Sequence, residues 1–271
     1  MPELPEVETV VRGLKPKVTG RTIGRVDLRR ADIVSPPGID LAPLLVGRKI
    51  AGIERRAKRI VFTLSDGARF YIHLGMTGQL TVDSPSAPEK PHTHVVIDLT
   101  GRPAAQIRFR DPRRFGGIFW LGANDGGETG LGPEPLTLSQ GRFVIRVLNT
   151  KRAVKVALLD QRLIAGIGNI YADEALFDAG IHPQAMTNEL NARQTRALLT
   201  SIKKVLRRAI KHRGSTLRDF VDADGESGGY RSRHKVYDRA GEPCPRCKAC
   251  AIQRIVLGGR STCFCPTCQK R

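Results

Sequence analysis

The 271-residue sequence lacks several features that mark whole classes of proteins. No run of apolar residues approaches the roughly 20 that a membrane-spanning helix needs, and the first residues lack the basic and then apolar pattern of a signal peptide. No cysteine occurs before position 244, and no internal repeat is visible. We therefore expect a cytoplasmic globular protein rather than a membrane protein or a small secreted domain held by disulfides.

Acidic residues are also scarce, since 26 Asp and Glu stand against 45 Lys and Arg, which gives a formal net charge of +19. This charge exceeds the modest value that solubility requires. It indicates a polyanionic partner, either a nucleic acid or an anionic membrane surface. The length allows one large or two ordinary domains with a sizeable core.

The N-terminal segment MPELPEVETV is acidic, unlike the chain as a whole, because it holds three glutamates within eight residues. Pro5 suits the first turn of a helix, and an apolar face with helical spacing follows it. Glu6 and Glu8 would complement the positive end of the helix dipole. This interpretation leaves Pro2 and Glu3 unexplained.

Short segments rich in β-branched and aromatic residues fill much of the first 120 residues. They are bounded by turn residues and lie at residues 59–64, 69–74, 94–99 and 106–110. This spacing predicts a β-sandwich or barrel. Gly and Pro accumulate between about 122 and 135, which predicts a linker, and helical periodicity follows it.

Six cysteines lie in the last 28 residues, and clustered cysteines in a cytosolic chain indicate a metal site. The outer four form two C-x2-C knuckles that can surround one tetrahedral Zn²⁺: Cys244, Cys247, Cys265 and Cys268. Because four thiolates close the coordination shell, the ion is expected to be structural.

A second arrangement of knuckles is open, since Cys247 and Cys250 also have the C-x2-C spacing. The Cys-Pro-x-Cys sequence shared by the outer pairs favours the first set and leaves Cys250 and Cys263 as free thiols near the ion. Residues 252–262, between the knuckles, predict a β-hairpin with a Gly-Gly tip. Arg260, just beyond this tip, is a candidate phosphate contact.

Eight segments, taken in their order along the chain, resemble a single enzyme family. The segments are PELPEVETV (2–10), RRAK (55–58), HLGMTG (73–78), DPRRFGG (111–117), LGPEPL (131–136), GIGNIYADEALF (166–177), AGIHP (179–183) and the cysteine hairpin. They resemble the bacterial formamidopyrimidine-DNA glycosylases over essentially the whole chain. The sister family, endonuclease VIII, typically has Gly in place of Leu4, so this N-terminus favours the branch that acts on purines. The two cysteine knuckles stand one residue further apart here than is usual in the family.

The resemblance implies an α+β multidomain fold. Residues 1–130 would form a β-sandwich with flanking helices, and residues 131–234 a helical domain with a helix-two-turn-helix motif. Residues 235–271 would form a zinc-finger hairpin around one structural Zn²⁺. The loop that closes over the damaged base in this family would lie at residues 215–229, within the helical domain.

The family excises oxidised purines, such as 8-oxoguanine and formamidopyrimidines, and then cuts the strand by β- and δ-elimination. By resemblance, Pro2 is the nucleophile that forms a Schiff base once the initiator methionine is removed, and Glu3 is the general acid/base. Lys58 carries over as the residue of β-elimination and phosphate contact, and Arg260 as that of δ-elimination. Glu6 is expected to orient the N-terminal turn and to cap the helix.

A glycosylase must extrude its target nucleotide and fill the resulting gap in the duplex. The resemblance assigns this role to Met76 as a flexible apolar wedge, together with Arg113 and Phe115. The family also implies DNA contacts for four further residues, of which the last lies at a phosphate-binding helix N-terminus: His92, Lys151, Lys155 and Asn169.

Two other functions stay open on the sequence alone. A zinc-containing nucleic-acid-binding protein without catalysis would account for the charge and the cysteines. An enzyme similar to endonuclease VIII would instead remove oxidised pyrimidines. For the favoured enzyme we expect damaged double-stranded DNA as the partner and no membrane. We expect a monomer that acts in the cytoplasm on the nucleoid of a bacterial cell.

Overall fold

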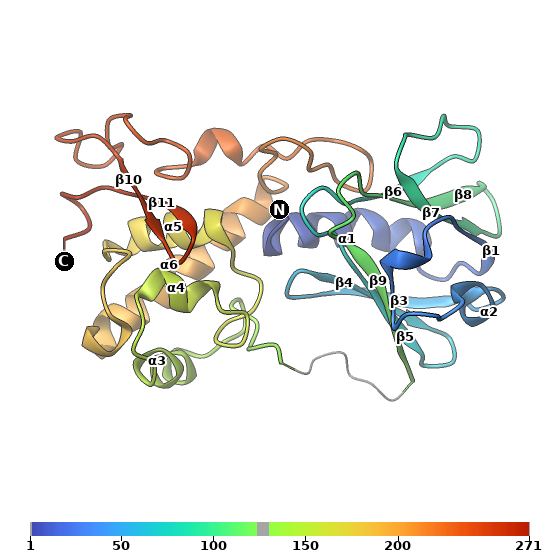
Figure 1. Ribbon diagram of the computed structural model, residues 1–271, viewed down its shortest axis with the longest axis horizontal. Helices are drawn as coiled ribbons and strands as arrows, with labels where there is room; N and C mark the ends of the chain where they lie inside the picture. The colour runs from blue at the N-terminus through green and yellow to red at the C-terminus, as the bar shows by residue number, and fades with distance from the viewer. Residues whose placement is uncertain (1, 124–129, 271) are drawn as a thin grey trace. The chain divides into compact units, whose positions relative to one another are not determined.

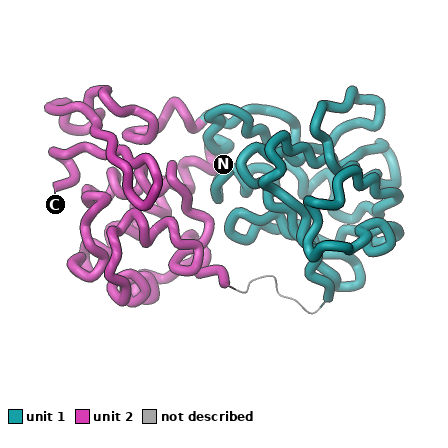
Figure 2. Tube along the Cα trace, viewed as in Figure 1, with its two compact units in different colours: residues 1–129, 212–229 teal, residues 130–211, 230–271 magenta. Residues whose placement is uncertain are grey.

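The computed structural model describes residues 2–123 and 130–270. The chain folds into two compact units, which Figure 2 distinguishes by colour. Unit 1 comprises residues 1–129 and 212–229, and unit 2 comprises residues 130–211 and 230–271. Figure 1 labels the helices and strands along the chain.

Helix α1 (Leu4–Val18) begins unit 1. Pro5 lies in its first turn, where the missing N–H costs no hydrogen bond, and Glu3 is the N-cap residue. The apolar face predicted from the sequence, which runs from Val7 to Leu14, is buried.

Two β-sheets form most of the remainder of unit 1. The first has the strand order β1-β7-β8-β6 and the second has the order β2-β9-β5-β4-β3, with every pairing antiparallel except that of β2 with β9. The first sheet contains β1 (Ile23–Leu28), β7 (Thr93–Leu99), β8 (Ala105–Arg110) and β6 (Gln79–Asp83). The second contains β2 (Val34–Ser35), β9 (Gly117–Gly122), β5 (Arg69–His73), β4 (Arg59–Leu64) and β3 (Ile50–Arg56), and the short helices η1 (Ala31–Ile33) and α2 (Leu41–Leu45) lie among them in sequence. The four predicted strands correspond to β4, β5, β7 and β8.

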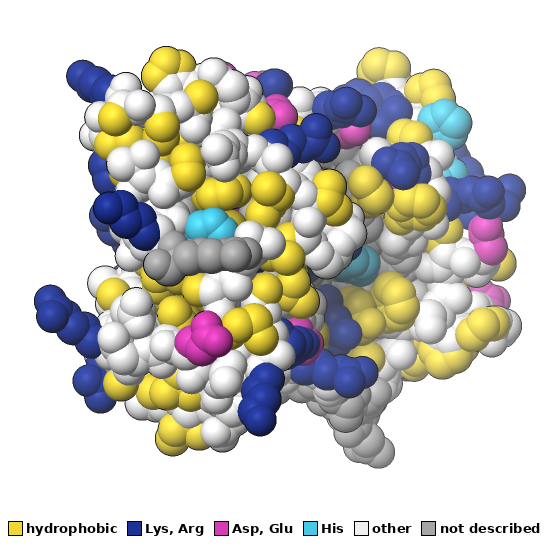
Figure 3. All heavy atoms as spheres, turned by 60° about the vertical axis from the view of Figure 1, so that its left-hand side comes forward, with side chains coloured by type: hydrophobic (Ala, Val, Ile, Leu, Met, Phe, Trp, Pro, Cys, Tyr) yellow, Lys and Arg dark blue, Asp and Glu magenta, His cyan; other side chains and the backbone are white. Residues whose placement is uncertain are grey.

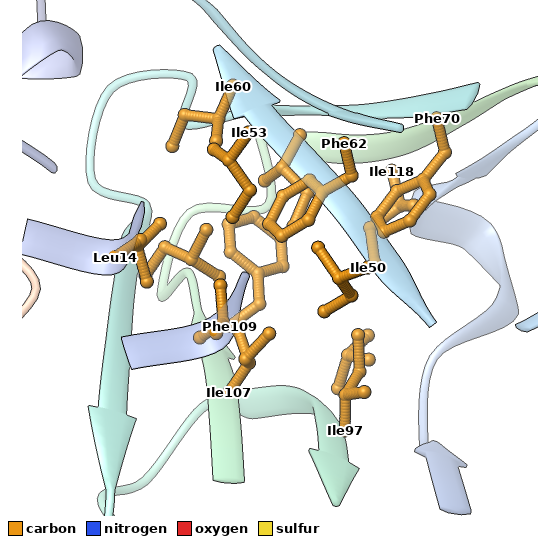
Figure 4. Close-up of a cluster of buried hydrophobic side chains, with 14 of the residues drawn as sticks. Leu14, Ile50, Ile53, Ile60, Phe62, Phe70, Ile97, Ile107, Phe109 and Ile118 are labelled. Carbon is orange, nitrogen blue, oxygen red and sulfur yellow. The ribbon is translucent and has the colours of Figure 1, made fainter. Parts of the chain in front are cut away.

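Side chains from both sheets share one hydrophobic core (Figure 4). Phe62 of β4 stacks on Phe70 of β5 with ring centroids 4.6 Å apart. Ile97 of β7 and Phe109 of β8 belong to the same buried cluster, as does Leu14 of α1. Burial of each such side chain stabilises the fold by about 1.5–3 kcal/mol. The predicted β-sandwich is therefore confirmed, with α1 packed on it.

Helices dominate unit 2. They are α3 (Gln140–Leu148), α4 (Val154–Leu159), α5 (Asn169–Ala179), α6 (Ala192–Lys211), η2 (Thr187–Glu189) and η3 (Arg231–Arg233). Helices α4 and α5, with the turns at residues 160–168 between them, form the predicted helix-two-turn-helix. Strands β10 (Gln253–Leu257) and β11 (Arg260–Phe264) form the predicted hairpin, and β11 packs against α5.

The compact units differ from the three predicted domains. The sequence predicts that residues 212–229 belong to the helical domain, and by their contacts they group with the β-sandwich in unit 1. The sequence predicts a separate domain for the zinc hairpin, and by its contacts the hairpin groups with the helices in unit 2. Of the predicted linker, residues 124–129 lie outside the described residues. Within the described ranges, none of the helices has the length and apolar character to cross a membrane.

Candidate functional site

The N-terminal turn of unit 1 combines Pro2 with two buried carboxylates. Pro2 is buried, and Glu3 and Glu6 expose only 2% and 1% of their surface. Glu6 Oε2 accepts a hydrogen bond of 2.9 Å from the backbone N–H of Glu3, so Glu6 fixes the residue next to Pro2. Its other oxygen, Oε1, accepts a hydrogen bond of 2.6 Å from the N–H of Ser215. The expected orienting role of Glu6 thus has a geometric basis, whereas the expected removal of Met1 concerns a residue outside those described.

Lys58 lies in the tight turn between β3 and β4, and its side chain is largely buried. Arg55 connects this turn to α1: its Nε donates to Glu8 Oε2 at 2.9 Å, and its Nη1 donates to the carbonyl oxygen of Ala57 at 3.1 Å. Helix α1, which starts directly after Pro2 and Glu3, is thereby tied to the turn that carries Lys58. An ion pair between Glu8 and Arg55 therefore joins α1 to the basic RRAK segment.

His73 supports the same turn from β5. Its Nδ1 lies 3.2 Å from the carbonyl oxygen of Lys58. Burial lowers the pKa of His73, and its hydrogen bond with this backbone oxygen opposes that shift. Because a carbonyl only accepts hydrogen bonds, the neutral ring must carry its proton on Nδ1.

Two loops of unit 1, residues 74–78 and 111–116, carry the three predicted gap-filling residues, and we call these two loops the platform. Asp111 is fully buried and organises it: Thr77 Oγ1 donates to Asp111 Oδ1 at 2.5 Å, and the Gly116 N–H donates to Oδ2 at 2.7 Å. Met76 lies in the first loop and is 41% exposed, and Phe115 in the second is 57% exposed. Exposed apolar side chains on a rigid platform are suited to inserting between bases.

Arg113 belongs to this platform, and His92 is bonded to it from the loop before β7. The Arg113 guanidinium lies 4.7 Å from the centroid of the Phe115 ring, and the Arg113 N–H is 3.3 Å from Thr77 Oγ1. His92 is exposed, and its carbonyl oxygen accepts from the Asp111 N–H at 3.1 Å. The sequence marks Asp111-Pro112 as a turn, but it does not reveal that the Asp111 carboxylate joins the two loops.

The 212–229 segment contains the predicted base-covering loop and folds onto unit 1 without helix or strand. Besides the bond from Ser215 to Glu6, the N–H of Val82 donates to the carbonyl oxygen of Ala223 at 3.0 Å. A Cβ added to Gly13 of α1 would lie 2.8 Å from the Cβ of Ala223, so the segment packs closely on this helix. Within unit 1, the N-terminal turn and this segment are therefore directly connected.

In unit 2, Asn169 is the first residue of α5, as the predicted phosphate-binding role requires. The turn before it is built by Gln161, whose Nε2 donates to the carbonyl oxygen of Ile167 at 2.8 Å and whose Oε1 accepts from the Gly166 N–H at 2.8 Å. Asn169 Nδ2 donates to the carbonyl oxygen of Ser261 in the hairpin at 2.9 Å. The positive end of the α5 dipole is thus fixed beside β11.

The structure contradicts a direct DNA contact by Lys155. Its side chain is completely buried, and its Nζ lies 2.6 Å from Asp173 Oδ1. The same Nζ donates to the carbonyl oxygen of Ser261 and to Thr262 Oγ1, each at 2.8 Å. A charge that is already satisfied in the interior cannot reach a phosphate. Lys151, just before α4, is exposed and remains a candidate for DNA contact.

Sequence reasoning also missed two buried acids of α5 that hold neighbouring segments, Asp173 and Glu174. Burial raises the pKa of Asp173 to about 7, and Lys155 opposes this shift. Glu174 accepts hydrogen bonds of 2.9 Å from the N–H groups of Lys235, Val236 and Tyr237, and burial raises its pKa. The adjacent acids within the otherwise apolar segment IYADEALF were a signal, because buried carboxylates need partners.

The four outer cysteines form the predicted metal site. The sulfurs of Cys244, Cys247, Cys265 and Cys268 all lie within 4.8 Å of one another. The distances between Sγ atoms are 3.9 Å for Cys244 and Cys268 and 3.7 Å for Cys247 and Cys265. A Zn–S bond of about 2.3 Å places tetrahedral sulfurs about 3.8 Å apart, so these thiolates fit one Zn²⁺. The outer set is therefore confirmed over the knuckle of Cys247 and Cys250, and the zinc would hold the base of the hairpin.

Arg260 is the first residue of β11 and is exposed. It pairs with Leu257 across the Gly-Gly tip, where Gly258 and Gly259 have positive φ angles of 56° and 70°. A Cβ on Gly258 would lie 3.1 Å from Val156 Cγ2, so the tip lies close to α4. The hairpin therefore presents Arg260 at an exposed tip, as the sequence predicts.

Comparisons with known proteins match three consecutive parts of the chain. Family models match residues 1–118 as the formamidopyrimidine-DNA glycosylase N-terminal domain, residues 131–221 as the H2TH domain of the same enzyme, and residues 241–271 as a zinc finger found in Fpg and IleRS. The formamidopyrimidine-DNA glycosylase of Chloroflexus aggregans is 46% identical to this chain and covers 99% of it, with 98% of the relative matched.

Solved structures give the same result. MutM (Fpg) of Thermus thermophilus is 41% identical with a TM-score of 0.87, over 99% of this chain and 98% of that one. Lactococcus lactis Fpg in complex with DNA containing an abasic site is 34% identical with a TM-score of 0.91, over 99% of this chain and 100% of that one. The chain therefore belongs to the formamidopyrimidine-DNA glycosylase family.

Proposed function

We propose that this protein is a bifunctional DNA glycosylase and AP lyase that removes oxidised purines, such as 8-oxoguanine and formamidopyrimidines, from duplex DNA. It would serve base-excision repair in the cytoplasm, as a monomer on the nucleoid. The observation that carries the proposal is the N-terminal turn, in which Pro2 is followed by the buried carboxylates of Glu3 and Glu6. A solvated helix start has no need of buried acids.

The proposed chemistry of Pro2 requires removal of Met1, which would make Pro2 the N-terminal residue. An α-amino group has a pKa of roughly 7.7–8.0, against about 10.4 for a lysine, so about a tenth of it is neutral at pH 7. The neutral secondary amine attacks C1′ of the damaged nucleotide, and the base leaves with the glycosidic electron pair. Glu3, next to Pro2, protonates the sugar ring oxygen, which opens the ring. The resulting iminium ion has no N–H to lose and therefore stays cationic.

That cation acts as the electron sink for strand cleavage. Loss of a proton from C2′ expels the 3′ phosphate in β-elimination, and δ-elimination then expels the 5′ phosphate. We assign Lys58 to the first elimination and to phosphate contact, and Arg260 to the second. The hydrogen bonds from Arg55 to Glu8 and to Ala57 support the role of Lys58, because they hold its turn against α1.

Base extrusion would use the platform around Asp111. Met76 and Phe115 would wedge into the stack, and Arg113 would hydrogen-bond the orphaned base opposite the lesion. His92, Lys151 and Asn169 would contact phosphates, and such contacts fix the register of a protein on DNA without reading its sequence. The net charge of +19 supports this polyanionic partner.

Borohydride trapping tests this function against that of a zinc-containing DNA-binding protein without catalysis. Reduction of the iminium ion with an 8-oxoguanine duplex should yield a covalent complex of one chain and one strand. Pro2→Gly, or an N-terminal extension that blocks the amine, should abolish the complex while DNA binding persists. Absence of the complex with the unmodified chain would leave only the binding function.

A comparison of substrates tests the specificity. We expect cleavage of 8-oxoguanine duplexes to exceed that of thymine glycol duplexes at equal enzyme and salt concentrations. The opposite order would assign the chain an endonuclease VIII-like preference for oxidised pyrimidines. Because both substrates report the same elimination chemistry, this comparison isolates base recognition from strand cleavage.

A further inference from the structure

We propose that Lys155 and Asp173 are positioning residues for Arg260, and that with Asn169 they form a buried latch which fixes the tip half of the zinc hairpin. The inference rests on the proposed function, since Arg260 is assigned there to δ-elimination. None of the three latch residues needs to touch the reacting atoms. They act through the backbone of Ser261 and Cys263 and through the hydroxyl of Thr262, all in β11.

The contacts of the latch converge on three consecutive residues of β11. The carbonyl oxygen of Ser261 accepts from Lys155 Nζ at 2.8 Å and from Asn169 Nδ2 at 2.9 Å. Lys155 Nζ also donates to Thr262 Oγ1 at 2.8 Å. The N–H of Cys263 donates to Asp173 Oδ2 at 2.9 Å. The strand immediately after Arg260 is therefore bonded to α4 and to α5.

Because the ion pair is buried, its contacts allow only one position of β11 against α4 and α5. Lys155 is completely buried and Asp173 is 1% exposed, with Nζ and Oδ1 2.6 Å apart. A buried ion pair must satisfy its remaining hydrogen-bonding groups, because each charge has lost its water. Here those groups are satisfied by the hairpin backbone and by Thr262. A shift of β11 along its axis would leave both charges without these partners.

Zinc alone cannot position Arg260. The nearest ligand in sequence, Cys265, directly follows β11 and is five residues from Arg260, which corresponds to roughly 17 Å at about 3.3 Å per residue. A two-stranded hairpin is only marginally stable without support, and the tip itself consists of two glycines. The latch begins one residue from Arg260 and thus supplies the constraint that the metal cannot.

Loosening the latch is predicted to impair δ-elimination, the last step of the reaction, and to spare the earlier steps. Base removal and β-elimination are assigned to Pro2, Glu3 and Lys58 of unit 1, whereas Arg260 is assigned to δ-elimination. Loosening the latch should therefore leave the β-product to accumulate at the expense of the δ-product. A residue that merely stabilised the fold would instead lower both products together.

The test compares Lys155→Met and Lys155→Met/Asp173→Asn with the unmodified chain. Thr262→Val is included as a milder variant, because it keeps the shape of the side chain and both charges of the latch. It removes the hydroxyl that accepts from Lys155 Nζ and donates to the carbonyl oxygen of Arg260 at 3.2 Å. Lys204→Met is the matched control, since Lys204 also pairs with an aspartate of α5, Asp178, at 2.8 Å, but its side chain is exposed. Each protein is assayed for zinc content, for borohydride trapping on an 8-oxoguanine duplex and for the ratio of δ- to β-product.

We expect the latch variants to bind one zinc per chain and to trap within about twofold of the unmodified rate. Their ratio of δ- to β-product should fall at least tenfold for the Lys155 variants and about two- to threefold for Thr262→Val. Arg260→Ala should show the same shift, and Lys204→Met should show none. An unchanged product ratio in folded, zinc-loaded Lys155 variants would overturn the inference. Equal losses of trapping and of both products would also overturn it, in favour of a general structural role.

The failure of this inference can be told apart from a failure of the proposed function. If the unmodified chain forms no trapped complex, the function itself is wrong. If the unmodified chain traps and Arg260→Ala shifts the products, but the latch variants do not, only the positioning role is wrong.

Discussion

Glu6 uses its two carboxylate oxygens on backbone N–H groups from segments that are distant in sequence. One belongs to Glu3 in the N-terminal turn, and the other belongs to Ser215 in the 212–229 segment. A Cβ on Gly214 would lie 2.7 Å from Glu6 Oε1, so only a residue without a side chain allows this approach. One side chain thereby connects the proposed nucleophile with the loop proposed to cover the damaged base.

Replacement of Glu6 by Gln should break one of these two bonds, because the amide presents N–H groups where an acceptor is needed. An unsatisfied buried donor costs about 1–3 kcal/mol, which corresponds to roughly 5- to 150-fold in rate if the cost falls on the reactive geometry. We expect borohydride trapping to slow by about 10- to 100-fold. Glu54→Gln, at an exposed position on β3, is the matched control and should trap normally. A normal trapping rate for Glu6→Gln would contradict the connection.

His234 predicts an acid-dependent loss of stability in unit 2. It is 4% exposed and lies between the rings of Tyr230 and Tyr237, at 5.7 and 5.6 Å. Burial lowers its pKa to about 4, whereas the unfolded chain should titrate near the ordinary value of about 6.5. Between these values the unfolded state binds a proton that the folded state does not. Stability is therefore fully present above pH 6.5 and is lost as the pH falls toward 4, by roughly 3 kcal/mol in total.

Urea unfolding at pH 7 and pH 5 measures this effect. His234→Gln removes the titrating ring, so the part of the stability loss between these pH values that arises from His234 should disappear. The variant is expected to be less stable than the parent at pH 7, and the difference should shrink at pH 5. Parallel pH profiles for the two proteins would show that His234 is not the source.

At the scale of elements, the platform around Asp111 depends on how closely two loops approach. Gly75 has a φ of +60°, and a Cβ there would lie 2.4 Å from both the Gly116 nitrogen and the Phe115 carbonyl carbon. Gly75→Ala should therefore push the loops apart and displace Met76 from Phe115. We expect excision of 8-oxoguanine to fall at least tenfold, while cleavage of a preformed abasic site falls much less. Gly52→Ala on β3 is the control, because nothing lies within 4 Å of its added Cβ. Equal losses on the two substrates would contradict a role in base extrusion.

The zinc knuckles give a prediction about metal retention. Cys265→Ser removes one of the four clustered sulfurs, so it should lower zinc content well below one ion per chain and loosen the hairpin. Cys250→Ser should retain the ion, although Cys250 Sγ lies only 3.3 Å from Cys265 Sγ. Metal analysis of the purified variants measures both effects. Loss of zinc from Cys250→Ser, with retention in Cys244→Ser, would assign the site to the inner knuckle instead.

Elements with local signals could be predicted from the sequence, and those held by distant partners could not. The strands at 59–64 and 106–110 follow from β-branched and aromatic residues between turns, and the cysteine spacing predicts the metal ligands. The placement of residues 212–229 depends on Glu6 and Gly13, which lie about 200 residues earlier. The resemblance to the family predicts that Lys155 faces DNA. Its buried ion pair with Asp173 cannot be recognised from the sequence, because the two residues are brought together only by the fold.

At the scale of the whole molecule, positive charge is the dominant property. On the face in Figure 3, Lys and Arg side chains are more numerous than acidic ones. Many of these cations already serve the fold, as Lys204 does with Asp178 and Arg55 does with Glu8. Net charge therefore indicates that DNA is attracted, but it does not identify which cations reach phosphates.

The salt dependence of DNA binding distinguishes cations that contact phosphates from cations that contribute only to the net charge. Each phosphate contact releases condensed counterions, so the slope of log K against log salt is about −0.9 per contact, and six to ten contacts give roughly −5 to −9. Lys151→Met removes an exposed cation that we assign to a phosphate, and it should make the slope shallower by about 1. Lys204→Met removes the same charge from an ion pair on α6 and should leave the slope unchanged. Fluorescence anisotropy with an abasic-analogue duplex between 50 and 200 mM salt measures both. Equal slopes for the two variants would mean that Lys151 contributes only through net charge and makes no phosphate contact.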